Sequence, residues 1–155
     1  MIDQQVIEDL APLALEWAAR QEKFILARGS PLGRQALTDA RRVGVQEPAR
    51  VRVLVVEKIA LPDLPELAAA SRRAHIITDA SGGVAFGYGI ILRADRWGDR
   101  ELLVHQLAHV AQCERAGGIG QFVPQYLTDR RTCADFTVGS LEDEARRLAR
   151  EVCTA

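Results

Sequence analysis

The sequence predicts a single α+β domain, and three observations lead to this class. Helical patterns occupy both ends of the chain, at residues 3–28 and 141–152, whereas β-prone segments lie between them. Hydrophobic residues make up 48% and charged residues 26% of the 155 residues, which is the balance of a folded globular protein. A chain of this length buries one substantial core. We therefore expect one domain over residues 1–155, with an N-terminal helical part (1–45) and a core part (50–155).

The overall charge and the cysteines narrow the possible partners and the compartment. Twenty Lys and Arg nearly balance twenty-one Asp and Glu, so the formal net charge of −1 gives no general attraction for nucleic acid or an anionic membrane. The N-terminus, MIDQQVIEDL, is acidic and lacks the apolar run of an export signal. The three cysteines, Cys113, Cys133 and Cys153, form no CxxC pair. We expect a reduced cytoplasmic protein without nucleic-acid or membrane partners.

The first elements expected are two helices. Residues 3–28 carry apolar side chains at spacings of three and four, which is typical of an amphipathic helix; these are Val6, Ile7, Leu10, Leu13, Ala14, Trp17, Phe24 and Ile25. Pro12 predicts either a bend in this helix or its true start. A second helix is expected from Pro31 to Val43, because proline favours the first turn and Gly44 follows the last.

The middle of the chain predicts a small twisted sheet. Residues 50–57, RVRVLVVE, alternate and are rich in valine, which is typical of a β-strand. A short helix is expected at residues 65–73. In residues 75–94, HIITDASGGVAFGYGIILRA, the run Ser81-Gly82-Gly83 separates two β-prone segments. This arrangement predicts a hairpin or two adjacent strands.

The most informative helix follows the sheet. Asp99 is a plausible N-cap and Gly117-Gly118 a stop signal, with HQLAH between them. Two histidines four residues apart lie on one face of a helix, so the imidazoles of His105 and His109 can reach one metal ion. A zinc site of this kind needs a third protein ligand, and Glu142 on a later helix is available.

Two further helices complete the prediction. Residues 121–130 are expected to form a short helix interrupted near Pro124. Residues 141–152 are expected to form the last helix, where Ser140 and Asp143 have the spacing of a capping box.

These motifs resemble those of the zincin metallopeptidases. The run LLVHQLAHVAQ is similar to their H-E-x-x-H helix, and LEDEARRLA resembles the later E-x-x-A helix of the gluzincin branch. The similarity is greater to small bacterial proteins that carry RADRWGD-like residues, an H-E-L-x-H-V helix and an E-x-E-A helix, and it extends from Val51 to Ala149. It implies a zincin-like domain that binds Zn²⁺ through His105, His109 and Glu142. The Met-turn branch is excluded because Met1 is the only methionine.

Several individual assignments have alternatives. By periodicity alone, Glu142 and Glu144 both flank the apolar face of the last helix, and the family pattern selects Glu142. Tyr126 lies where some zincins place a phenol that stabilises the oxyanion, although packing is the commoner role of such a tyrosine. His75 stands alone before a predicted strand and is expected to be a core or surface histidine. Cys113 is expected to be a buried thiol.

The departure from the family pattern lies at Gln106. In active zincins this position is a glutamate that accepts a proton from the water activated by zinc. A neutral amide can hold a water molecule but cannot act as a base near neutral pH. General acid–base catalysis typically contributes about 10² to 10⁴ in rate, so we expect this chain to be inactive or strongly impaired as a peptidase.

The resemblance implies a peptide or protein substrate. Residues 86–93, FGYGIILR, are expected to form the edge strand along the cleft, where an extended peptide can pair. One alternative is a zinc-dependent binding or regulatory module that holds a peptide without cutting it, which Gln106 favours. A second is a structural zinc domain whose fourth coordination position is closed by protein.

Overall fold

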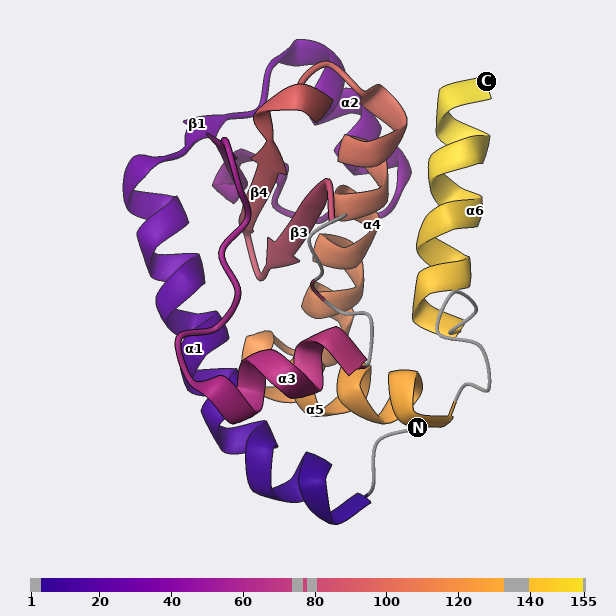
Figure 1. Cartoon of the computed structure of the whole chain (residues 1–155). Helices are drawn as coiled ribbons and strands as arrows, with labels where there is room; N and C mark the ends of the chain where they lie inside the picture. The colour runs from indigo at the N-terminus through magenta and orange to yellow at the C-terminus, as the bar shows by residue number, and fades with distance from the viewer. Residues whose placement is uncertain (1–3, 74–76, 78–80, 133–139, 155) are drawn as a thin grey trace.

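A computed structural model describes residues 4–73, 77, 81–132 and 140–154. Within these residues the chain forms six α-helices and a mixed four-stranded sheet, which confirms the α+β class (Figure 1). The helices are α1 (Gln4–Arg28), α2 (Arg34–Arg42), α3 (Pro65–Arg73), α4 (Arg100–Ala116), α5 (Ile119–Thr132) and α6 (Ser140–Thr154). The strands are β1 (Ser30–Pro31), β2 (Arg52–Val56), β3 (Gly83–Phe86) and β4 (Gly89–Arg93), with short 3₁₀ turns at Pro48–Arg50 and Ala94–Arg96.

The order of the strands places β3 at an edge of the sheet. The order is β1-β2-β4-β3, with β2 and β4 parallel and the other two pairs antiparallel. The prediction that residues 86–93 form the edge strand is therefore wrong. Gly87 and Tyr88 form a turn inside that segment, β4 lies between β2 and β3, and all its residues except Arg93 are buried.

The described hairpin lies within the second predicted β-prone segment. Ser81-Gly82-Gly83 leads into β3, whereas the turn between β3 and β4 is made by Gly87 and Tyr88. Gly87 has a φ of 59°, in the left-handed region that tight hairpin turns require. The first segment, residues 75–80, is outside the described residues except for Ile77, so the pairing of the two segments stays a prediction.

The sheet separates two apolar clusters, and the alternation of side chains along β4 divides its residues between them. Ile90 and Leu92 pack with residues of α2, α4 and α6. Ile91 faces the other way and packs with α1 and α3. Gly89 allows α1 to approach closely, since a Cβ there would lie 2.9 Å from the Cβ of Ile25. The N-terminal helix and the histidine-bearing helix thus cover opposite faces of the sheet.

Three prolines test the predicted helix boundaries. Pro12 and Pro124 lie inside α1 and α5, so neither starts nor ends its helix. Pro31 is part of β1 and not of α2, which begins three residues later after Gly33. A proline at this edge strand is tolerated because it needs no ladder donor there.

The ends of α4 and α6 are fixed by identifiable contacts. The Asp99 carboxylate accepts a hydrogen bond from the amide of Leu102 at 3.0 Å, and Gly117 ends α4 with a φ of 102°. These contacts confirm the predicted cap and stop. At the start of α6, the Ser140 hydroxyl donates to Asp129 of α5, and the other oxygen of that carboxylate accepts from the amide of Leu141 at 3.2 Å.

None of the helices in the described part of the chain combines the length and the low polarity that a membrane span requires.

Candidate metal centre

Helix α4 presents two histidines on one face. The side chains of His105 and His109 are 19% and 9% exposed, and their ring centroids lie 4.9 Å apart. The Nε2 atoms of the two rings are separated by 3.2 Å. Residues 104 and 106–113 are buried. The predicted one-turn spacing therefore places two imidazole nitrogens side by side at the protein interior.

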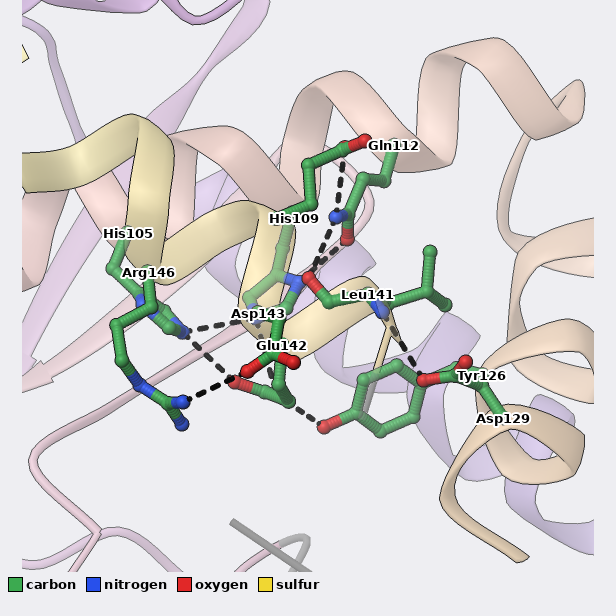
Figure 2. A network of polar contacts seen from close by, with 10 residues as sticks. His105, His109, Gln112, Tyr126, Asp129, Leu141, Glu142, Asp143 and Arg146 are labelled. Carbon is green, nitrogen blue, oxygen red and sulfur yellow. Dashed lines mark hydrogen bonds and ion pairs between the residues drawn. The ribbon is translucent and has the colours of Figure 1, made fainter. Parts of the chain in front are cut away.

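Glu142, near the start of α6, completes the group (Figure 2). One carboxylate oxygen lies 3.0 Å from Nε2 of His105, and the other lies 3.2 Å from Nε2 of His109. The three candidate ligand atoms all lie within 4.8 Å of one another. Helices α4 and α6 pack closely because small side chains line their contact, as Ala145 and Ala149 are 0% and 1% exposed. His105, His109 and Glu142 could together hold a metal ion.

The electrostatics of the group favour a charged carboxylate. Burial alone raises the pKa of Glu142. The hydrogen bonds with His105 and His109 and the charge of His109 outweigh burial and hold the pKa below its usual range, with a further contribution from Tyr126. Glu142 therefore stays ionised, which a metal ligand requires.

Gln112 orients His109 and joins the two helices, a role that the sequence analysis missed. Its Oε1 lies 2.8 Å from Nδ1 of His109, and its Nε2 donates to the carbonyl of Leu141 at 2.8 Å. Because the amide oxygen can only accept, Nδ1 carries a hydrogen, which leaves Nε2 as the ring nitrogen of His109 that would bind a metal. The available signal was the spacing, since a residue three positions after His109 lies on the same face.

Glu144, the alternative third ligand, is engaged elsewhere. One of its oxygens accepts hydrogen bonds from Gln112 at 3.1 Å and from Arg115 at 2.6 Å. The metal-ion group among the described residues contains Glu142 and not Glu144.

Tyr126 contacts the candidate centre, and Gln106 lines the cavity beside it. The Tyr126 hydroxyl donates to Glu142 at 2.6 Å, so the phenol braces the candidate ligand. Gln106 is 6% exposed, and a Cβ added to Gly83 of β3 would lie 3.4 Å from its Cγ. The amide at position 106 is thus buried between α4 and the edge strand.

An apolar cavity of about 290 Å³ adjoins the group. His105, Gln106, His109, Tyr126 and Glu142 form part of its lining, and most of the remainder is apolar and comes from α1, α3, β3 and α5. The candidate centre therefore opens onto a space that a ligand could enter.

Other residues considered in the sequence lie away from this group or outside the described residues. Cys113 is buried, and desolvation raises the pKa of its thiol to about 12. Cys113 does not belong to the metal-ion group found among the described residues. His75 and Cys133 lie outside the described residues.

The donor set fits a zinc ion. Two imidazole nitrogens and one carboxylate oxygen form a common protein ligand set of catalytic zinc sites. The contact between Gln112 and the far nitrogen of His109 is the outer interaction that metal-ligating histidines usually make.

Comparisons with models of known protein families, with curated proteins and with solved structures find no match. From its own fold and site, the chain is an α+β domain with a candidate metal centre of two histidines and a glutamate.

Proposed function

We propose that this chain is a zinc-binding protein of the gluzincin metallopeptidase type, with His105, His109 and Glu142 holding one zinc ion. The observation that carries the proposal is the convergence of these three side chains beside an apolar cavity. Zinc in such a site supplies Lewis acidity and lowers the pKa of water. The reaction class proposed is hydrolysis of peptide bonds.

The residues around the centre suggest how far this chain can carry out that reaction. Tyr126 and Gln112 hold Glu142 and His109 in place. Gln106 occupies the position of the general base, and its amide can donate or accept a hydrogen bond but cannot take a proton near neutral pH. We therefore propose that hydrolysis is strongly impaired and that zinc binding is retained.

The edge strand supports a peptide as the partner. The amide of Arg93 donates to the carbonyl of Gly82 at 2.8 Å, so these two residues form a hydrogen-bonded pair of the antiparallel β3–β4 ladder. Hydrogen-bonded and non-hydrogen-bonded pairs alternate along an antiparallel ladder. The N–H and C=O groups of Gly83 and Ala85 therefore point away from β4. Both residues line the cavity, so an extended peptide could pair with them next to the histidines.

A second candidate function is peptide binding without cleavage. Among the described residues that line the cavity, Glu142 is the only carboxylate. It lies within hydrogen-bonding distance of both histidines and accepts from Tyr126, so it is a poor replacement for the missing base. This observation favours a zinc-dependent binding or regulatory module.

The test compares the wild-type protein with Gln106→Glu. Both should purify with about one zinc per chain from a preparation without chelator, because the substitution keeps the side-chain length and leaves the proposed ligands unchanged. At equal zinc occupancy, Gln106→Glu should hydrolyse a library of unstructured peptides about 10² to 10⁴ times faster.

Three results would change the proposal. Metal content near zero in both proteins would reject the zinc site. Equal hydrolysis by both proteins would reject the role of position 106. Zinc binding with no hydrolysis by either protein would favour the binding module.

A further inference from the structure

We propose that the cavity beside His105, His109 and Glu142 is a specificity pocket for one large apolar side chain, preferably aromatic, of the bound peptide. This inference rests on the proposed function and names the substrate class of the same site. The pocket is lined mainly by α1, α5, β3 and α3, together with the candidate centre. Of these, α1 and α3 pack on the face of the sheet opposite the main α4 core.

The walls of the cavity are suited to an aromatic ring. Trp17 of α1 and Phe86 of β3 lie edge to face, with ring centroids 5.2 Å apart. On α5, Phe122 and Tyr126 have ring centroids 5.8 Å apart. Aromatic walls offer edges and faces to a further ring, a geometry that contributes beyond the burial of area.

The distribution of charge argues against a charged side chain in the pocket. No lysine, arginine or aspartate is among the described lining residues, and the single glutamate, Glu142, belongs to the candidate centre. Of the other polar lining residues, all but Ser71 are at that centre. A charged group placed among the apolar walls would lose its water without gaining a partner.

The volume sets the size of the group. An engineered apolar cavity of about 150 Å³ holds a benzene molecule, so about 290 Å³ is enough for one aromatic side chain. Whole small-molecule sites occupy about 300 to 1,000 Å³. The cavity therefore fits one side chain, while the backbone of the peptide would lie along the edge strand β3.

The position of α1 makes it the main determinant of the pocket. One face of the helix supplies six lining residues, which are Val6, Ile7, Leu10, Ala14, Trp17 and Ala18. Ala14 is small and partly buried, so it leaves open space that a larger side chain would fill. Ala19, five residues further along the same helix, is exposed and does not line the cavity.

The experiment measures the binding of end-blocked five-residue peptides by NMR titration. They consist of alanine with phenylalanine, alanine or lysine at the centre, and the protein is studied both zinc-loaded and treated with chelator. The phenylalanine peptide should bind about tenfold to a hundredfold more tightly than the alanine peptide, from burial of its side chain. The lysine peptide should bind no more tightly than the alanine peptide.

Matched variants test whether the cavity is responsible. Ala14→Phe should bring the preference for the phenylalanine peptide close to one, because the new ring occupies the pocket. Val123→Phe fills the pocket from α5 and should have the same effect if Ala14→Phe does not fold. Ala19→Phe adds the same ring on the solvent side of α1 and should keep the wild-type preference.

The results separate this inference from the proposed zinc function. A preference that is present in chelator-treated protein and removed by the pocket variants supports the pocket even if zinc is not bound. Equal binding of all three peptides, including no binding, overturns the pocket even if the protein holds zinc. A preference that survives in a folded Ala14→Phe or Val123→Phe protein also overturns it.

Discussion

Helices α1 and α4 border the same cavity but contribute to it in opposite ways. Helix α4 brings two histidines and the amide of Gln106, and its residues 106–113 are all buried. Helix α1 brings an apolar wall and also has three exposed large apolar side chains, since Leu13, Phe24 and Leu26 are 40%, 45% and 38% exposed. The chemistry of the candidate site thus depends on spacing within one helix, whereas the shape of the space beside it depends on how a distant helix packs.

The largest effect is expected from a ligand change on α4. His109→Ala should lower zinc affinity by more than the roughly 10- to 100-fold that loss of an outer-shell partner costs, because a direct ligand is removed. Isothermal titration with zinc measures this effect. Glu142→Ala should act similarly, and Glu144→Ala should keep most of the affinity. If instead Glu144→Ala loses the metal and Glu142→Ala does not, the assignment of the third ligand is wrong.

A smaller effect is expected from a change at Gln112, which contacts the ring of His109 but is not one of the proposed metal ligands. Gln112→Leu should reduce zinc affinity about 10- to 100-fold, because His109 loses the acceptor that orients its ring. Arg115→Met is the matched control, since it breaks the contact of Arg115 with Glu144 but leaves Gln112 in place. Equal losses in the two variants would contradict a specific role for Gln112.

Stability should depend on the ion pair that fixes the start of α4. Arg100 binds Asp39 of α2 through two 2.9 Å contacts, and Asp39 is 1% exposed. Asp39→Asn should lower the free energy of unfolding by about 1.5 to 3 kcal/mol at neutral pH. The lower end is expected because the Arg100 side chain is 41% exposed. Urea denaturation measures the change.

The same pair predicts a pH dependence. The hydrogen bond from Arg100 outweighs burial and holds the pKa of Asp39 below its usual 3.8. The stabilisation is therefore complete above that value and is lost as the pH falls through the lower folded-state pKa. The difference in free energy of unfolding between wild type and Asp39→Asn should shrink in that acidic range.

An exposed ion pair serves as the control for the Asp39 substitution. Glu151→Gln, which removes an exposed pair with Arg147, should lower the free energy of unfolding by less than about 1 kcal/mol at neutral pH.

The smallest effect is expected from cutting the chain between α2 and β2. We predict that residues 1–45 and 50–155 form one domain, because α1 packs against β4 and α5. Limited proteolysis near residue 47 should therefore leave the two pieces associated and the zinc content unchanged. Release of the first piece from a stable, metal-bound remainder would show that α1 is an accessory segment, and it would weaken the role of α1 in the pocket.

The sequence was sufficient where the determining contacts are local. The cap at Asp99, the stop at Gly117 and the juxtaposition of His105 and His109 follow from the geometry of one helix. The hairpin was harder to place because two glycine-rich segments competed for the turn. The positive φ of Gly87 identifies the one that forms it, and that backbone angle cannot be read from the residue type alone.

By itself, then, the sequence determined the α+β class and the two histidines, because helical periodicity and caps are set by neighbours a few residues apart. Only the tertiary structure decided which glutamate meets them. Glu142 and Glu144 flank the same apolar face, and the packing of α6 on α4 turns the first toward the histidines and the second toward Arg115. It also decided that β3 is the edge strand and that α1 walls the cavity, because strand order and helix docking depend on contacts between residues far apart in the chain.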